Sequence, residues 1–193
     1  MACGCDSHYI FHPALKYMNK VISGFLFFAI AATMHADDKK APFKLSVVPT
    51  ASGTNQGVIS VAKKEPQVFY VVLTNISDQP QPTWETWNSW GFWTISFDLT
   101  MPNGKHFLIT KNRREGFTVN FPSMFFVAPG EHQVYPIHLD AEWDNRPAFA
   151  ENGETRVILK AIYEVSPTKE SAKYGVWTGR IESTGYELIL NHW

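Results

Sequence analysis

The chain has 193 residues, of which 45% are hydrophobic and 18% charged; this length favours one domain, and this composition excludes a disordered protein. Aromatic residues make up 15% of the chain, enough to build a substantial core without disulfides. The net charge of −1 creates no long-range field for nucleic acid or an anionic membrane, so we expect neither as a partner.

Residues 18–36 have the organisation of a secretory signal peptide. Lys20 precedes a short apolar stretch at 21–34, and small residues lead to a polar start at Asp37. The apolar stretch is shorter than the roughly 20 residues that a membrane-spanning helix needs. We therefore expect an exported protein, periplasmic or secreted, with no membrane span after cleavage. An uncleaved membrane anchor is the alternative.

The segment before Met18 does not belong to this signal pattern, because a signal peptide normally starts near its positive region. We predict that Met18 is the true start, and that residues 1–36 are an upstream extension plus the signal-peptide helix. Residues 37–193 then form a single domain. Cys3 and Cys5 lie in the upstream extension, so we expect a mature domain without disulfides or thiolate ligands.

The mature region has the pattern of an all-β protein. Turn residues recur at short intervals, and the runs between them are rich in β-branched and aromatic residues. The polar stretch 167–173 is expected to form one helical turn or a loop. We predict an antiparallel β-sandwich of about seven to nine strands. The expected strand segments are 43–48, 57–62, 68–74, 93–100, 105–110, 117–127, 132–139, 155–165, 177–183 and 186–190.

The clearest alternation lies at residues 93–100, where every second residue from Trp93 to Leu99 is apolar. This period of two predicts a half-buried strand with Trp93 in the core. Asn103-Gly104 follows and predicts a hairpin with a type I′ turn, in which both central residues have positive φ. The segment 117–127 is expected to be one strand, kinked at Pro122.

Several short motifs follow one another over most of residues 67–165. They are Leu73-Thr-Asn75 at a strand end, Pro102-Asn-Gly-Lys105, Val127-Ala-Pro-Gly-Glu131 before a strand, Trp143, and Gly153 before an alternating strand. This order resembles the immunoglobulin-like sandwiches of bacterial exported proteins. It is most similar to the BsuPI-type proteinase-inhibitor domain. The resemblance implies an immunoglobulin-like sandwich and, from that family, proteinase inhibition.

Tryptophan recurs at every third residue from Trp84 to Trp93, a feature that the fold class does not predict. We expect a loop here, with Trp93 buried, Trp90 largely buried and Trp84 the most exposed. One interpretation is an aromatic platform that stacks on sugar rings or on apolar peptide side chains. The alternative is a loop that packs over one open end of the sandwich. The candidate ligand-binding residues are Trp84, Trp87, Trp90, Trp143, Tyr174 and Trp177.

No catalytic motif is recognisable in the sequence. Gly-x-Ser-x-Gly and phosphate-binding glycine loops are absent, and His138 with Asp140 supplies only two metal ligands. We therefore expect a non-enzymatic binding or accessory domain with no metal or cofactor and with a carbohydrate or protein partner. The alternatives are a secreted proteinase inhibitor that acts by loop insertion, and a structural module of a cell-envelope assembly that pairs through strand edges.

Overall fold

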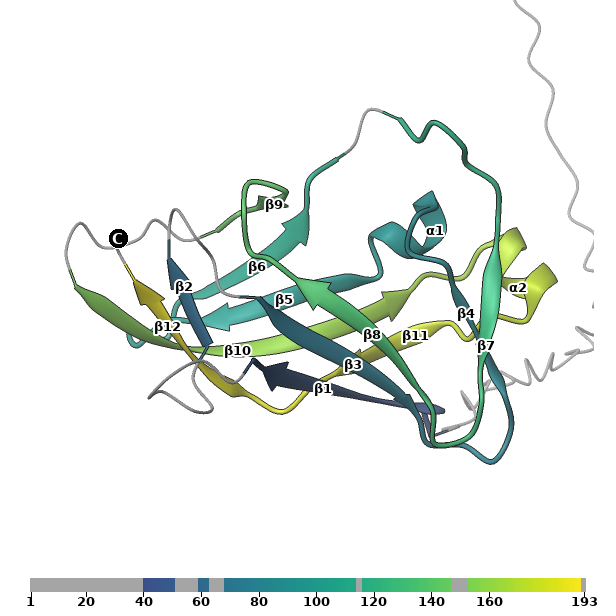
Figure 1. Ribbon diagram of the computed structural model, residues 1–193, viewed down its shortest axis with the longest axis horizontal. Coiled ribbons are helices and arrows are strands. Elements are labelled where there is room, and N and C mark those ends of the chain that lie inside the picture. Colours follow the sequence, from purple (N-terminus) through teal and green to yellow (C-terminus); the bar gives the residue numbers. More distant parts are fainter. Residues whose placement is uncertain (1–39, 51–58, 63–67, 114–115, 147–152, 192–193) are drawn as a thin grey trace, which may run out of the picture. The chain divides into compact units, whose positions relative to one another are not determined.

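The computed structural model describes residues 40–50, 59–62, 68–113, 116–146 and 153–191. The predicted signal peptide, Met18 and both cysteines lie outside the described residues. Within the described residues the regular structure is mostly β-strand, with two short helices (Figure 1). The strands are β1 (Phe43–Pro49), β2 (Ile59–Ala62), β3 (Phe69–Asn75), β4 (Gln81–Trp84), β5 (Ile95–Thr100), β6 (His106–Lys111), β7 (Met124–Val127), β8 (His132–Ile137), β9 (Trp143–Asp144), β10 (Glu154–Val165), β11 (Gly179–Glu182) and β12 (Tyr186–Asn191). The helices are α1 (Ser89–Phe92) and α2 (Lys169–Tyr174).

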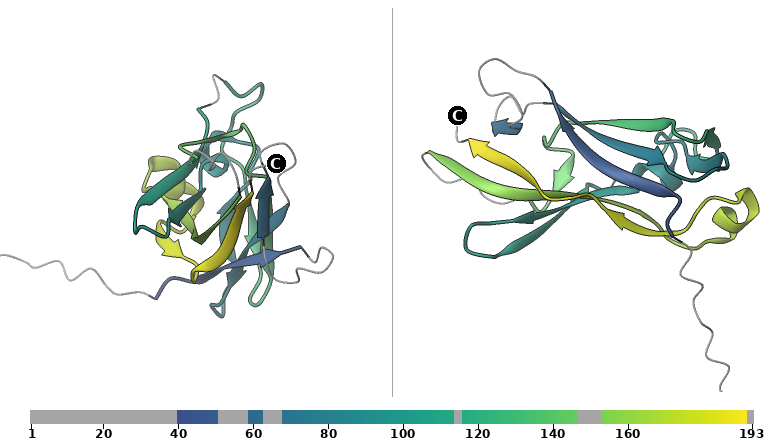
Figure 2. Two further views of the ribbon diagram at one scale, coloured as in Figure 1. Left: turned by 90° about the vertical axis from the view of Figure 1, so that its left-hand side faces the viewer. Right: turned by 90° about the horizontal axis from the view of Figure 1, so that it is seen from below.

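The strands form two facing layers, which confirms the predicted β-sandwich (Figure 2). One layer is a three-stranded sheet in the order β1-β3-β8. The other has the order β2-β12-β10-β5-β6-β9, with β11 also paired to β10, and a separate pair joins β4 to β7. All described pairings are antiparallel except β2 with β12. The described strands number twelve, more than the expected seven to nine, because short pieces such as β4 and β9 were not predicted.

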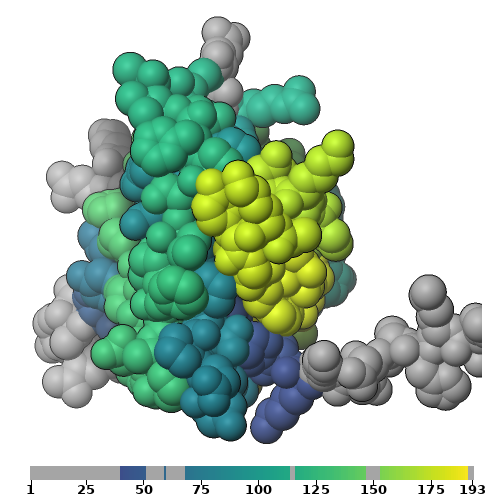
Figure 3. All heavy atoms as spheres, turned by 90° about the vertical axis from the view of Figure 1, so that its right-hand side faces the viewer, coloured from purple at the N-terminus to yellow at the C-terminus, as the bar shows by residue number. Residues whose placement is uncertain are grey.

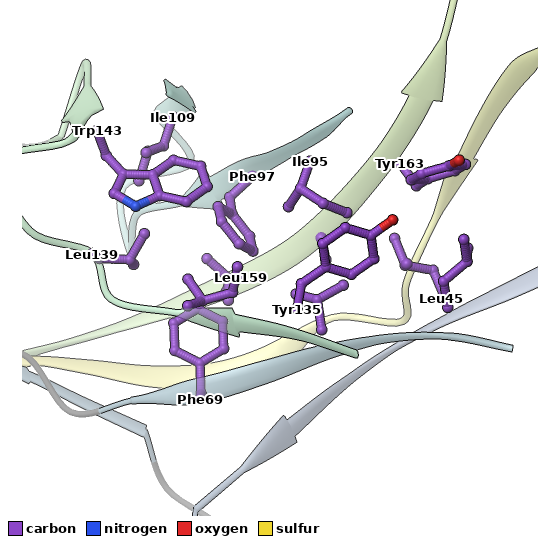
Figure 4. Packing of buried hydrophobic residues seen from close by; sticks show 14 of the residues in the cluster. Leu45, Phe69, Ile95, Phe97, Ile109, Tyr135, Leu139, Trp143, Leu159 and Tyr163 are labelled. Atoms are coloured by element: carbon purple, nitrogen blue, oxygen red, sulfur yellow. The ribbon is translucent and has the colours of Figure 1, made fainter. Parts of the chain in front are cut away.

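The core lies between the two layers and is filled from both (Figure 4). Phe69 of β3 meets Phe97 of β5 in an edge-to-face contact with ring centroids 5.7 Å apart. The buried residues of β5 alternate as predicted, and the inward face of β10 does the same. Among the described residues, no helix is long and apolar enough to cross a membrane.

The hairpin between β5 and β6 is present, but its turn differs from the expected type I′. Gly104 has φ 79°, whereas Asn103 is not among the described residues with positive φ. The N–H of Gly104 donates to the carbonyl of Met101 (2.9 Å), and the N–H of Met101 donates to the carbonyl of Lys105 (2.8 Å). This is a three-residue loop with glycine in the left-handed region, the next most common hairpin connection.

The prediction of one long strand at 117–127 is wrong, because only its last part, β7, pairs as a strand. Residues 117–123 form a connection instead, in which Pro122 lacks the N–H that a ladder would need. The partner of β7 is β4, with Gln81 opposite Val127 and Trp84 opposite Met124. This pairing brings the tryptophan run beside the segment 117–127.

Candidate functional site

The tryptophan run continues from the end of β4 through a turn into one helical turn, α1. The Asn88 side chain caps this helix by accepting from the backbone N–H groups of Trp90 (3.1 Å) and Gly91 (3.0 Å). The Asn88 amide also donates to the carbonyl of Ser123 (3.0 Å), which ties the turn to the neighbouring segment. Glycine is required at position 91, because a Cβ there would lie 2.1 Å from the carbonyl oxygen of Glu85.

Trp84 is part of the core, and the expectation that it would be the most exposed tryptophan of the run is wrong. Only 2% of its surface is exposed. Its ring lies 6.2 Å from that of Trp90, and it meets Tyr174 of α2 edge to face at 5.7 Å. Figure 3 shows α2 and the segment 117–127 side by side on this part of the surface. Trp84 is buried because it ends β4 beneath α1 and α2, a closure that the sequence pattern does not reveal.

Trp93 is 40% exposed, so its predicted place in the core is also wrong. It follows α1 directly, with φ −98° and ψ 10°, and is therefore not yet in the extended backbone of β5. Phe92 takes the buried position instead, and the strand alternation begins at Ile95. The alternation of apolar residues in the sequence therefore begins two residues before the strand does.

The other candidate residues are dispersed over separate contacts. Trp143 is 5% exposed and packs on Phe97, with ring centroids 5.1 Å apart. Trp177 is half-buried and stacks on Tyr163 at 6.2 Å with an interplanar angle of 13°. Trp87 is 43% exposed and contacts Phe121 instead of the other tryptophans of the run. The single platform of Trp84, Trp87, Trp90, Trp143, Tyr174 and Trp177 is therefore not formed.

A groove of about 700 Å³ lies against the exposed ring of Trp93 on the outer face of the larger sheet. We call it the Trp93 groove. Five neighbouring strands, β11, β10, β5, β6 and β9, contribute lining residues. A row of polar side chains crosses them, namely Arg180, Glu164, Ser96, Thr110 and Asp144, and β6 also contributes Leu108 and Lys111. The register supports this row, because Glu164 lies opposite Arg180 and Thr110 opposite Asp144. The groove therefore runs across the strands.

A second hollow of about 220 Å³ adjoins the groove on the side of α1. It is lined by Trp84, Trp90 and Trp93 together with hydroxyl side chains of Ser89 and Thr168. Both hollows share Trp93, Glu164 and Ser166. Trp93 therefore stands between two adjoining depressions, and two of the predicted platform tryptophans border the smaller one.

The orientation of the Trp93 ring is set by three contacts. Phe92 and Phe117 meet it edge to face, with centroids 5.4 Å and 5.5 Å away and interplanar angles of 89° and 86°. The indole Nε1–H donates to the carbonyl of Asn112 at 3.4 Å. The ring is thus held in place before any ligand arrives, which reduces the entropy that binding would cost.

The groove has nearly balanced charge. Lys111, Arg113 and Arg180 line it together with the carboxylates of Asp144 and Glu164. Arg180 bonds Glu182 at 2.9 Å and Glu164 at 3.1 Å, and these contacts, Glu182 first, raise the pKa of its guanidinium. Arg180 therefore stays charged at any physiological pH, and its two carboxylate partners hold the side chain in one place.

The core contains buried tyrosine hydroxyls. Burial raises the pKa of the Tyr135 hydroxyl well above its usual range, and neighbouring Tyr163 adds to the rise, while contacts to Thr94 and Gln133 act in the opposite direction. Burial also raises the pKa of Tyr163. Both tyrosines stay neutral, so they stabilise the core without providing a base.

The sequence reasoning missed the residues that make the Trp93 groove. The alternation at 93–100 did place Ser96 on the outward face of its strand, but the partners of Ser96 across the sheet come from segments far apart in the chain. Arg180 and Glu164 carried no signal beyond being polar residues in strands. The available clue was which residues of β5, β6 and β10 face outward. To learn which of these residues are neighbours, one also needs the register between the strands.

The described residues contain no group of three or more His, Cys, Asp or Glu side chains that would hold a metal ion. His138 is exposed, and Asp140 accepts from the backbone N–H of Glu142 at 2.9 Å. His132 also has a neighbour, because its ring nitrogen lies 2.9 Å from the hydroxyl of Thr74.

In comparisons with known proteins, no family model matches the chain and no curated protein matches it.

Proposed function

We propose that this chain is an exported, non-enzymatic binding domain that takes its ligand in the Trp93 groove. The observation that carries the proposal is the position of Trp93, whose ring is exposed yet held by three contacts between two adjoining hollows. A groove of about 700 Å³ lies within the range of small-molecule and oligomer sites, which combine an apolar surface with a few fixed polar groups.

Export is part of the proposal and is supported by the signal-peptide pattern at residues 18–36. An immunoglobulin-like relationship is also part of it. The motif order over residues 67–165 supports that relationship, and so does the antiparallel two-layer arrangement. In this proposal the sandwich is a rigid support, and specificity lies in side chains that project from its outer face and from the turn after β4.

Isothermal titration calorimetry of the full-length chain tests the proposal. The probes are soluble fragments of cellulose, xylan, chitin and pectin, together with peptides from a tryptic digest of casein. We expect at least one probe to bind, with binding lost in Trp93→Ala and kept in Trp87→Ala. The two residues are matched controls, because Trp93 is 40% exposed and Trp87 is 43% exposed. If no probe binds at millimolar concentration, or if Trp93→Ala binds unchanged, the proposal is wrong.

Proteinase inhibition is a second candidate, favoured by the connection between β6 and β7. This connection exposes apolar side chains, with Val119 57% and Phe121 53% exposed. An inhibitor presents such a segment to a protease. Inhibition of a secreted serine, cysteine or metalloprotease at micromolar concentration, weakened by Phe121→Ala but not by Trp93→Ala, would support this function over the first.

A further inference from the structure

Resting on the proposed function, we infer that the ligand of the Trp93 groove is a neutral saccharide chain. The chain would lie across the strands of the larger sheet, with one pyranose ring stacked on Trp93. The inference rests on the strands that floor the groove, the hydrogen-bonding side chains that line it, its charge, and the second hollow beyond the indole.

The floor of the groove is made of strands that already have partners. β10 pairs with β5 and with β11 and β12, β5 pairs with β10 and β6, and β6 pairs with β5 and β9. A peptide that binds by strand addition needs an unpaired edge whose backbone groups can hydrogen-bond to it. The Trp93 groove lies on the face of the sheet, over the paired strands β10, β5 and β6 and the edge strands β11 and β9, so its lining offers side chains to the ligand.

Those side chains suit hydroxyl groups, which both donate and accept hydrogen bonds. Arg113 and Arg180 offer donors, and the carboxylates of Asp144 and Glu164 offer acceptors. The hydroxyls of Ser96, Thr110 and Ser166 serve in either sense. A run of sugar hydroxyls finds donors and acceptors on each of the five strands, and the exposed Leu108 side chain adds an apolar contact.

The aromatic component is a single exposed ring. An indole face is electron-rich and attracts the slightly positive C–H bonds on the apolar face of a pyranose ring. Phe92 and Phe117 contact Trp93 edge to face instead of stacking on it. This arrangement leaves part of the indole exposed, as its 40% accessibility requires.

The charges of the groove give an acidic chain little advantage over a neutral one. The lining has three cationic and two anionic side chains, and the Arg180 guanidinium already bonds Glu164 and Glu182. A uronate carboxylate would enter a groove that contains the carboxylates of Asp144 and Glu164. The cationic and anionic side chains nearly cancel, so a carboxylated sugar gains little over a neutral one here.

The second hollow implies a ligand longer than one sugar. It lies beyond Trp93 and presents the hydroxyls of Ser89 and Thr168 next to Trp90. A chain stacked on Trp93 would reach polar groups on both sides of the ring. Affinity should therefore rise with chain length from the monosaccharide upward and level off once further sugars extend beyond the two hollows.

The test compares three classes of ligand by titration calorimetry on the full-length chain. They are neutral gluco-, xylo- and chito-oligosaccharides of one to six units, oligogalacturonates of the same lengths, and casein peptides. We expect a neutral series to bind, with the affinity of the trisaccharide lowered about tenfold or more by Trp93→Ala. Thr110→Val should weaken binding by a few fold, since it removes a hydroxyl from the floor. Thr100→Val is the matched control, because Thr100 is on the same face of the sheet but outside the groove.

The outcomes separate this inference from the proposed function. If only casein peptides or only oligogalacturonates bind, and do so through Trp93, the saccharide inference is overturned while the groove remains a binding site. If neutral saccharides bind equally well in Trp93→Ala, the assignment to this groove is overturned. If nothing binds, both fail.

Discussion

Trp84 and Trp93 stand at the two ends of one tryptophan run, yet one is a core residue and the other a surface residue. Trp84 is 2% exposed and meets Trp90 and Tyr174, while Trp93 is 40% exposed and borders the Trp93 groove. The difference arises in the turn between them, where Asn88 caps α1 and rotates the chain before β5 begins. The same residue type thus stabilises the sandwich at one end of the run and forms a binding surface at the other.

The largest expected effect comes from Trp84→Ala. Removing a buried indole should lower the free energy of unfolding by about 3–5 kcal/mol, because it loses apolar burial and leaves a cavity. Urea denaturation followed by circular dichroism measures this loss. Trp87→Ala is the control, since its ring is 43% exposed and should cost far less. Equal losses in the two variants would contradict the buried position of Trp84.

Asn88→Ala should have the next largest effect. It removes the cap of α1 and the bond to the Ser123 carbonyl, and the loss of a cap alone lowers stability by about 1–2 kcal/mol. Asn88→Asp keeps the capping oxygen but removes the amide donor, so we expect a smaller loss. Thermal unfolding distinguishes the two variants. If Asn88→Ala were as stable as the wild type, the prediction that this cap stabilises the turn would be wrong.

Trp93→Ala should change stability little, by about 1 kcal/mol, because its main loss is the edge contacts with Phe92 and Phe117. The contrast with Trp84→Ala is the sharpest test of the comparison between the two ends of the run. The measurement is again urea denaturation. A loss as large as that of Trp84→Ala would place Trp93 in the core.

Alkaline pH should destabilise the fold through its buried tyrosines. The pKa values of Tyr135 and Tyr163 are raised in the folded state, so the folded protein holds these protons after the unfolded chain has released them near the ordinary tyrosine pKa of 10.0. The free energy of unfolding is therefore unaffected by these groups below about pH 9. It falls above about pH 10, by at most about 1.4 kcal/mol per pH unit for each tyrosine.

Tyr163→Phe should reduce this alkaline loss, because it removes a buried hydroxyl whose pKa is raised. Denaturant midpoints between pH 8 and pH 11 provide the measurement. An unchanged alkaline slope in Tyr163→Phe would show that another group titrates.

Much of the fold was predictable because the relevant signals are local. The inward residues of β5 and β10 follow a period of two that any half-buried strand must show, and both faces were predicted correctly. The hairpin after β5 was predicted from Asn103-Gly104, although its turn type was wrong. Only Gly104 adopts the positive φ, and Asn103 does not.

The candidate site was predicted only in part. The run was recognised as unusual, and Trp90 is partly buried and borders the second hollow. Trp143 and Trp177 contact other aromatic rings. These contacts were not predicted, because the sequence does not show which rings meet. Trp93 was assigned to the core since the apolar alternation continued past the start of the strand.

The sequence by itself determined that the described domain is built of strands and which face of the long strands is buried, because alternation is a property of neighbouring residues. The tertiary structure alone decided which tryptophan is exposed and which polar residues meet around it. Arg180, Glu164, Ser96, Thr110 and Asp144 come together through the register of five strands, and that register depends on hydrogen bonds between segments far apart in the chain.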